Sequence, residues 1–398
     1  MEKAMSIMSD NLNKDISVVR IVFEFYPLIG GSIIHTLDLS KRINPYLKKQ
    51  TIIAPDFGDD CKNFDKHVGI EILRVKYHNF KKIWVIPVLP LNYIAYGLNV
   101  YALLKKMEGP YIIHAHGIFN ITLSKIIGKL LNVPTVGMLH GSIGAYSKTY
   151  DFLETILSIF FRPDYAFVVD DGSLAPEKFK KLWGNRVTIV NHGIDSNFFK
   201  HKKKSERLLH KIGVNESDFL ILSTSSLLPV KRIDLTIKSF KIFLDIVRKD
   251  NVYLLIVGCG PLQEFLINLT KELHIERNVI FLGGIQKNVI QEYLSIADVV
   301  VATSLYSNMN LSVQEAMACE IPVVVFDSGG IGRLIKHMKN GILVKSGNLE
   351  DFARYIFLLY ENLSLREEIG KNSRKTIVEE KSWDVRIKQE LDIYSRLC

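Results

Sequence analysis

Short apolar runs of strand length alternate along the chain with segments whose apolar residues recur at the helical period. The runs are continuous and rich in β-branched residues, which is typical of strands buried on both faces of a parallel sheet. Helices are predicted between them, for example over Ile33–Arg42, Leu235–Val247 and Gly260–Leu273. This repeated βαβ order predicts an α/β fold of the doubly wound class. The predicted strands are Val18–Phe25, Gln50–Ala54, Gly69–Lys76, Tyr111–Ala115, Thr135–Met138, Tyr165–Val169, Val187–Val190, Leu220–Ser225, Val252–Val257, Val279–Leu282, Val299–Ala302, Pro322–Phe326 and Gly341–Val344.

The alternation is interrupted once, between His201 and Asp218, where the chain is charged and polar. Seven predicted strands precede this segment and six follow it. We therefore expect two similarly built Rossmann-like domains, over residues 1–200 and 201–375, facing each other across a ligand cleft. Open α/β sheets bind their ligands at the carboxyl ends of the strands, so we look for the site residues there.

The stretch from Ile83 to Leu104 has no charged residue and is flanked by lysines, so a membrane-spanning helix is one interpretation of it. A bilayer-spanning helix needs about 20 apolar residues. Two prolines, two asparagines and a glycine within the stretch favour instead a strand over Ile83–Val88, a turn, and a buried helix over Leu91–Met107. A helix that lies against the cytoplasmic membrane face is the remaining alternative, so peripheral membrane contact stays among the expected partners.

The composition narrows the class of protein. Of the 398 residues, 47% are hydrophobic and 23% are charged, which excludes a disordered chain, a collagen-like fibre and a disulfide miniprotein. The net charge of +9 is spread over both halves of the chain. This favours an anionic ligand such as a phosphate, and we expect no nucleic-acid partner.

The cysteines and the N-terminus indicate a cytoplasmic protein. Four cysteines show no C-x-x-C spacing, so we expect neither a zinc site nor a disulfide framework. Such usage fits a reducing compartment. The segment from Met1 to Val18 is polar and of mixed charge and has no signal-peptide pattern. The cysteines are Cys61, Cys259, Cys319 and Cys398.

Three glycine-bearing turns follow predicted strands, where a phosphate group would bind. They are Pro27-Leu28-Ile29-Gly30-Gly31-Ser32, Gly258-Cys259-Gly260-Pro261 and Ser328-Gly329-Gly330. Glycine lets the backbone approach a ligand closely, although a plain tight turn explains the first motif equally well. The second begins like a dinucleotide fingerprint but has Gln263 where the third glycine belongs, which disfavours NAD binding.

The stretch from Thr303 to Pro322 is the most informative. A strand ends, a polar loop follows, and Glu315 lies one turn into a short helix that ends before Pro322. The free amides of the loop and the start of the helix would attract an anion. Glu315 would be placed to accept hydrogen bonds from ribose hydroxyls.

Together with further short motifs, this order resembles the retaining GT-B glycosyltransferases of glycosyltransferase family 4, over nearly the whole chain. The resemblance implies the GT-B fold, with a C-terminal helix within residues 376–398 that crosses back to the first domain. The matching pieces are Tyr26-Pro27…Gly30-Gly31…His35, Ile112-Ile113-His114-Ala115-His116-Gly117, Leu139-His140-Gly141, Val190-Asn191-His192-Gly193-Ile194-Asp195, Lys231-Arg232-Ile233-Asp234, Val257-Gly258-Cys259-Gly260-Pro261, Glu315-Ala316-Met317-Ala318…Pro322-Val323 and Gly329-Gly330.

The activity that the resemblance implies is transfer of a sugar from a nucleotide-diphosphate donor to an acceptor hydroxyl, with retention of the anomeric configuration. The donor would be UDP- or GDP-linked and would act as co-substrate, with no cofactor and no metal. The acceptor would be a glycan or a lipid-linked molecule, in glycan or glycolipid synthesis.

The resemblance also implies roles for individual residues. Lys231 matches the lysine that neutralises the donor diphosphate, Glu315 the ribose contact, and His140 a cleft histidine beside the donor sugar. On the acceptor side, His116 would line the cleft wall as a structural residue. The other expected donor contacts are Gly30, Gly31, Arg232, Ser307, Asn310, Leu311, Ser312, Gly258 and Gly283, with the nucleobase bound through backbone atoms near Gly283.

Three positions depart from the family pattern. Ser307 replaces the first glutamate of the E-x7-E element, Ser226 replaces an arginine, and Arg333 replaces a glutamate. Losing a charged hydrogen-bond partner costs about 1.5–3 kcal/mol, so donor binding would weaken unless Arg232 or Arg333 supplies the missing charge. A different donor sugar would also explain Ser307. The departures leave open a catalytically degenerate nucleotide-sugar-binding or partner-binding module and, less favoured, a GT-B epimerase or phosphorylase.

Overall fold

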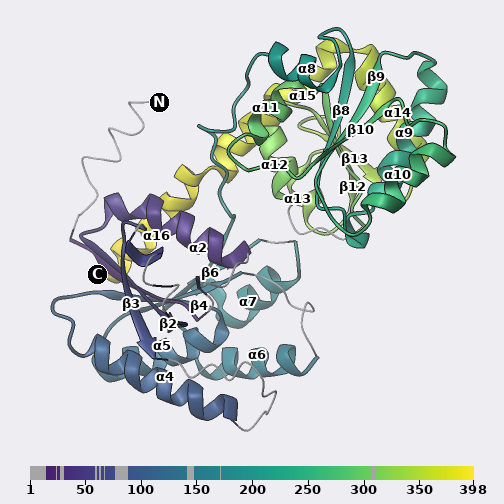
Figure 1. The fold of residues 1–398 in the computed structure, drawn as a ribbon. Helices are drawn as coiled ribbons and strands as arrows, with labels where there is room; N and C mark the ends of the chain where they lie inside the picture. Colours follow the sequence, from purple (N-terminus) through teal and green to yellow (C-terminus); the bar gives the residue numbers. More distant parts are fainter. Residues whose placement is uncertain are drawn as a thin grey trace. The chain divides into compact units, whose positions relative to one another are not determined.

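The computed structural model describes residues 15–23, 25–26, 31–58, 61, 64–66, 68–76, 88–140, 148–170, 172–305 and 310–398. They form two compact units, each built on one parallel sheet (Figure 1). The first unit holds the described residues up to Asp170, together with Leu174–His192 and Arg386–Cys398. The second unit holds Gly193–Val385 and the short segment ending at Ser173, so it starts before the expected boundary at residue 201.

The sheet of the first unit has seven strands in the order β3-β2-β1-β4-β5-β6-β7. All neighbouring strands are parallel. The strands are β1 (Ser17–Ile21), β2 (Lys49–Asp56), β3 (Glu71–Lys76), β4 (Ile112–His116), β5 (Thr135–Leu139), β6 (Tyr165–Val169) and β7 (Val187–Val190). The helices are α2 (Gly31–Ile43), α4 (Val88–Leu104), α5 (Ile118–Leu131), α6 (Lys148–Phe160), α7 (Ala175–Trp183) and, from Arg386 on, α16 (Trp383–Leu397).

The two faces of the first sheet differ in character, because side chains alternate between the faces along each strand. Val19 and Ile21 of β1 pack in one apolar cluster with Ile113 of β4 and with residues of α4, α5 and α7. The intervening Arg20 and His114 lie on the opposite face, and both are completely buried. This second face therefore needs partners for buried polar groups rather than a plain apolar cover.

The sheet of the second unit has six parallel strands in the order β10-β9-β8-β11-β12-β13. The strands are β8 (Phe219–Thr224), β9 (Val252–Val257), β10 (Val279–Gly283), β11 (Val299–Ala302), β12 (Val323–Asp327) and β13 (Ile342–Lys345). The helices are α8 (Glu206–Ile212), α9 (Ile233–Val247), α10 (Gln263–Glu272), α11 (Ile290–Ile296), α12 (Leu311–Ala318), α13 (Ile331–Leu334), α14 (Leu349–Glu361) and α15 (Leu363–Thr376).

Both faces of the second sheet are apolar. Leu220 and Leu222 of β8 pack with residues of α8, α11 and α12. Phe219 and Ile221, which alternate with them, pack on the other face with residues of α9, α10 and α14. An apolar core on each side explains why these strands read as continuous hydrophobic runs.

The structure confirms the predicted α/β fold and its thirteen strands, whose ends differ from the expected ones by a few residues. The prediction for the apolar stretch was wrong in its bounds: α4 starts at Val88, expected to end a strand, and it ends at Leu104 rather than Met107. Pro90 is tolerated because it lies in the first turn, where backbone N–H groups have no intrahelical acceptor. Residues 83–87 lie outside the described residues. Among the helices described, none combines the length and the apolar composition needed to cross a membrane.

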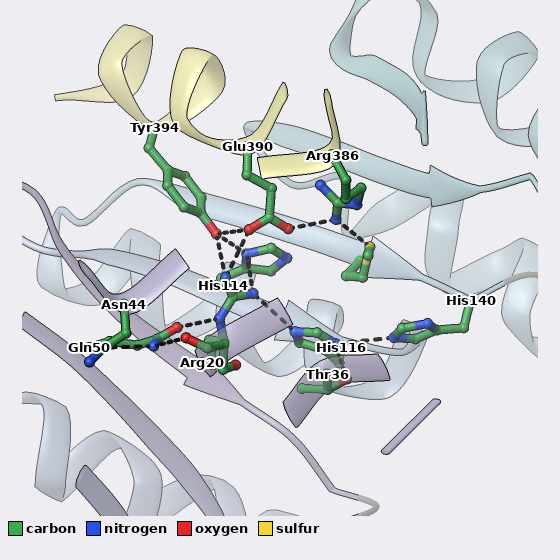
Figure 2. A network of polar contacts seen from close by, with 12 residues as sticks. Arg20, Thr36, Asn44, Gln50, His114, His116, His140, Arg386, Glu390 and Tyr394 are labelled. Atoms are coloured by element: carbon green, nitrogen blue, oxygen red, sulfur yellow. Dashed lines mark hydrogen bonds and ion pairs between the residues drawn. The ribbon is translucent and has the colours of Figure 1, made fainter. Parts of the chain in front are cut away.

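Helix α16 supplies the polar face of the first sheet with its partners (Figure 2). Nη2 of Arg20 donates to Oε2 of Glu390 at 2.8 Å and to the hydroxyl of Tyr394 at 3.2 Å. Nη2 of Arg386 donates to Oε1 of Glu390 at 2.6 Å. Nε of Arg20 reaches Oε1 of Gln50 at 2.9 Å. The side chains of Arg20 and Glu390 are fully buried, so strand β1 and the C-terminal helix are joined by an ion pair without solvent.

Replacing Glu390 with alanine is expected to lower the free energy of unfolding by about 3–5 kcal/mol, because two buried guanidinium groups lose their carboxylate. Glu367→Ala is the matched control, since Glu367 forms an exposed pair with Lys371, and it should cost less than about 0.5 kcal/mol. Urea unfolding followed by circular dichroism measures both. Equal costs for the two variants would show that α16 does not depend on this ion pair.

Candidate functional site

In the second unit, the strand order places the candidate site between β8 and β11. The chain runs outward from β8 to β10, then crosses to the other side of β8 to begin β11. In open α/β sheets, this reversal leaves a crevice at the carboxyl ends of the two strands. The loop with Lys231 follows β8, and Thr303 follows β11.

The loop after β8 presents two basic residues in different electrostatic states. Lys231 ends a short 3-10 helix (Pro229–Lys231), is half-buried, and has no carboxylate partner among the described residues. Burial lowers its pKa. Arg232 has both Nε and Nη2 bonded to Asp234, each at 2.9 Å. The charge of Arg232 is thus balanced within the loop, and Lys231 is the cation available to a ligand.

Thr303 anchors this loop to the end of β11. Its hydroxyl donates to the carbonyl oxygen of Arg232 at 2.7 Å and lies 2.7 Å from the hydroxyl of Thr236. Arg232 has a left-handed backbone, with φ of 49°, and directly precedes α9. A buried polar bridge therefore holds the turn in which Lys231 lies.

The loops after β8, β9 and β10 contact one another through their backbones. The amide of Gly258 donates to the carbonyl oxygen of Gly283 at 2.8 Å. A Cβ atom at Gly258 would lie 1.9 Å from the carbonyl oxygen of Ser225, so a side chain does not fit there. At Gly283, which has φ of 70°, a Cβ would meet open space. Ser226 is exposed beside this junction.

The remaining residues expected for donor binding belong to helix α12 and to the segment before it. Asn310 precedes the helix, and its Oδ1 accepts a hydrogen bond from the Ser312 hydroxyl at 2.8 Å. Asn310 also lines a hollow of about 10 Å³, about the size that holds one water molecule, at the carboxyl ends of β11 and β12. Leu311 is exposed at the start of the helix. Ser307 lies outside the described residues.

Glu315, like Lys231, is a half-buried ionisable residue without a partner among the described residues. It lies one turn into α12, and none of the described residues forms a hydrogen bond or ion pair with its carboxylate. Burial raises its pKa to about 7, an effect that the charge of Lys287 opposes. A desolvated carboxylate without a partner is characteristic of a binding site rather than of a structural contact.

Arg333 contacts the backbone of an earlier segment of the same unit. On α13, its Nη2 donates to the carbonyl oxygens of Gly172 and Ser173, at 3.4 and 3.2 Å. Gly172 packs tightly there, since a Cβ atom would lie 2.3 Å from the amide nitrogen of Gly330. Arg333 thus holds the segment 172–173 against the double-glycine turn.

In the first unit, the reversal in strand order lies between β1 and β4. His116 ends β4 and is buried, and its Nδ1 lies 3.2 Å from Nε2 of His140, which follows β5 (Figure 2). Gly31 begins α2, and Gly30 lies outside the described residues. The structure therefore brings the two predicted histidines into direct contact.

Four buried histidines of this unit are held in the neutral form. Desolvation by burial, and then neighbouring histidines and arginines, lower the pKa of His35, His114 and His116 well below the ordinary value. The pKa of His140 falls to about 3 for the same reasons. Neutral imidazoles offer one donor and one acceptor each, so they can orient a ligand without adding charge.

The sequence interpretation missed the buried residues that surround these histidines. Arg20, Thr36 and Glu390 received no role, although Nδ1 of His116 lies 3.2 Å from the Thr36 hydroxyl. Two features of the sequence could have revealed them. One is an arginine inside an apolar strand, and the other is the four-residue spacing of Arg386, Glu390 and Tyr394, which puts three polar residues on one helix face. Among the described residues, no cluster of three or more His, Cys, Asp or Glu could hold a metal ion.

Comparison with known proteins identifies the family. Residues 204–376 match the family described as glycosyl transferases group 1. The chain therefore carries a group 1 glycosyltransferase domain. It is 25% identical to N-acetyl-alpha-D-glucosaminyl L-malate synthase from Bacillus anthracis. The alignment of 369 residues covers 89% of this chain and 91% of that protein.

The fold of this group 1 glycosyltransferase agrees with solved structures. HepE from Anabaena, in complex with UDP, matches with a TM-score of 0.76 at 20% identity, over 96% of this chain and 100% of HepE. A glycosyltransferase from Rickettsia africae matches with a TM-score of 0.77 at 16% identity, over 96% and 98% of the two chains. The expected GT-B class of two Rossmann-like units is thereby confirmed.

The stability of the glycosyltransferase is expected to depend on the ionisation of Glu315. Because folding raises its pKa from the ordinary value near 4.3 to about 7, the folded state loses stability as the pH rises through this interval. Glu315→Gln should therefore raise the melting temperature relative to the wild type at pH 8 and change it less at pH 5. Differential scanning calorimetry at both pH values measures this difference.

Glu292→Gln is the control for Glu315→Gln, because Glu292 is an exposed helical glutamate in the same unit. Its melting temperature should stay parallel to that of the wild type across the pH range. If Glu315→Gln behaved in the same way, the carboxylate would not be desolvated.

Proposed function

We propose that this glycosyltransferase transfers a sugar from a nucleotide-diphosphate donor to an acceptor hydroxyl, with retention of the anomeric configuration. The observation that carries the proposal is the pair of half-buried, unpartnered charges in the second unit, Lys231 and Glu315. They follow β8 and β11, the strands that flank the reversal in strand order. A cation for a diphosphate and a carboxylate for a ribose are the two groups that a nucleotide sugar requires.

The candidate site residues of the second unit have separate tasks in the proposed reaction. Lys231 neutralises the charge that develops on the departing diphosphate. Glu315 accepts hydrogen bonds from the ribose hydroxyls, and the backbone amides of Asn310, Leu311 and Ser312 bind the donor sugar and phosphate. The tightly packed backbone at Gly258 and the open space beside Gly283 suit a flat nucleobase held through main-chain atoms.

For the first unit we propose that His140 binds the donor sugar, that the Gly30–Gly31 motif binds the phosphates, and that the acceptor binds to this unit. His116 acts there as a support for His140, which it contacts directly. The departing phosphate oxygen takes the proton of the acceptor hydroxyl on the same face of the sugar, so the new glycosidic bond forms as the sugar–phosphate bond breaks. This scheme uses neither a metal nor a cofactor.

The donor is proposed to be UDP-linked, with a GDP-linked donor as the alternative. Support for UDP comes from HepE, whose structures are described in complex with UDP and with UDP-glucose. For the acceptor we propose a glycan or a lipid-linked molecule. A relative from Staphylococcus aureus, 33% identical over 182 residues, is named poly(ribitol-phosphate) alpha-N-acetylglucosaminyltransferase.

A panel of UDP-, GDP- and ADP-sugars separates transfer from the rival functions. Each nucleotide is first tested for thermal stabilisation, since a ligand that binds the native state raises its melting temperature. Turnover of the stabilising sugar is then measured with and without acceptors. Saturable binding without turnover would favour a degenerate binding module, and epimerised or phosphorolysed products would favour the other enzymes. Ser307→Glu should change the donor preference if this position faces the sugar.

Replacing Lys231 with alanine is expected to lower the turnover number about 100-fold or more, because the leaving diphosphate loses its cation. Lys238→Ala is the matched control: Lys238 is an exposed lysine on α9, two turns further along, and its loss should leave turnover unchanged. Steady-state kinetics with the donor from the panel measures both variants. Unchanged turnover in Lys231→Ala would contradict the diphosphate assignment.

We further propose that helices α4, α5 and α6 dock on an anionic membrane surface. Each exposes apolar side chains: Ile94 and Leu98 on α4, Ile126 and Leu130 on α5, and Phe152, Ile159 and Phe160 on α6. Pairs four residues apart lie on one helix face. Exposed Lys105, Lys106 and Lys129 beside them complement anionic headgroups. Such docking would bring a lipid-linked acceptor to the enzyme.

The double variant Phe152→Ser/Phe160→Ser is expected to lose co-sedimentation with phosphatidylglycerol-containing vesicles, because both phenyl rings are largely exposed, at 66% and 75%. Phe265→Ser, which removes an exposed ring from α10 of the second unit, is the control and should bind as the wild type does. Wild-type protein that fails to sediment with these vesicles, or binds phosphatidylcholine vesicles equally well, would exclude an anionic membrane as the partner.

A further inference from the structure

A chain of polar contacts in the first unit leads from a buried arginine through one histidine to another (Figure 2). Nη1 of Arg20 lies 3.5 Å from Nε2 of His116. Nδ1 of His116 lies 3.2 Å from Nε2 of His140. The order of donors and acceptors along this chain determines which ring nitrogen of His140 carries the proton.

Arg20 determines the direction of the hydrogen bonds in this series of contacts. A guanidinium group has donors only. A proton on Nε2 of His116 would point at this cation, whereas a lone pair there is attracted to it, so Nε2 accepts. Because burial keeps the pKa of His116 low and its ring neutral, the single proton of the ring is on Nδ1.

The proton on His116 in turn determines which nitrogen of His140 is protonated. The Nδ1–H group of His116 faces two acceptors at 3.2 Å, Nε2 of His140 and the hydroxyl oxygen of Thr36. With Nε2 as acceptor, neutral His140 carries its proton on Nδ1. This nitrogen is buried and has no hydrogen-bond partner in the part of the chain that the structure describes. It is a donor available to an oxygen atom of a ligand.

We infer that Arg20, acting through His116, is a positioning residue that fixes His140 as an Nδ1–H donor for the nucleotide sugar. The inference deepens the proposed function and rests on it for the identity of the ligand. The recipient is a hydroxyl or phosphate oxygen of the donor. Since the ion pair with Glu390 holds Arg20 in place, helix α16 takes part in orienting a residue of the candidate site.

The tautomer of His140 is measurable without substrate. In the full-length protein labelled with ¹⁵N-histidine, two-bond ¹H–¹⁵N correlation spectra distinguish the two ring tautomers, and the spectrum of His140→Asn assigns the signal. We expect Nδ1 of His140 to be protonated in the wild type. His116→Leu removes the donor and should yield a mixture of the two tautomers, whereas Thr36→Val should leave the wild-type pattern.

A second substitution of His116 distinguishes the loss of the donor from misfolding of the variant. In His116→Asn, the side-chain amide nitrogen lies near the position of Nδ1 and still donates, so His140 should keep the wild-type pattern. A wild-type His140 protonated on Nε2 would overturn the inference. So would an unchanged His140 pattern in His116→Leu.

The kinetic readout uses the nucleotide sugar that the panel identifies. Asparagine places its amide nitrogen near Nδ1 of histidine and glutamine near Nε2, so His140→Asn should retain turnover within about threefold while His140→Gln loses about tenfold or more. The reverse order would overturn the inference. If no sugar is turned over but the Nδ1–H pattern is present, the proposed function fails and the positioning of His140 stands.

Discussion

The buried ion pair between Arg20 and Glu390 is the interaction on which the first unit depends. A lone guanidinium inside a sheet layer would cost several kcal/mol in desolvation, and a single carboxylate on the last helix balances it. Glu390 also accepts hydrogen bonds from Arg386 and Tyr394 of its own helix, and its bond with Arg20 ties that helix to strand β1. This requirement explains why the C-terminal segment belongs to a unit whose other residues lie far earlier in the chain.

The second unit follows the opposite design, with apolar packing on both faces of the sheet and charge confined to the loops at its edge. In this unit, the presence or absence of a bonded partner indicates the role of a charged side chain. Arg232 is neutralised by Asp234, and Arg333 donates to backbone carbonyl oxygens within its own unit. Lys231 and Glu315 are partly desolvated and have no partner among the described residues, so Lys231 gains from an anionic ligand group and Glu315 from hydroxyl donors.

Sequence reasoning was most successful where a local pattern carries the information. Buried strands of a parallel sheet are continuous apolar runs, and each was found. It failed at the start of α4, because the prolines were interpreted as marking a turn, whereas Pro90 is tolerated in the first helical turn. It also overlooked Arg20, a single charge within an apolar run, and Glu390, which looks like one more polar residue on a charged helix. Neither residue reveals its partner, because 370 positions separate them.

The sequence alone determined the α/β class, the two strand series, and the motif residues Lys231, Glu315, His116 and His140, since periodicity and short motifs are local properties of the chain. Only the tertiary structure decided which of these residues have partners and which nitrogen of His140 is left to donate. Those properties depend on desolvation and on the order of donors and acceptors among side chains of β1, β4, the loop after β5, and α16. Contacts between segments so distant in the chain have no counterpart in local sequence pattern.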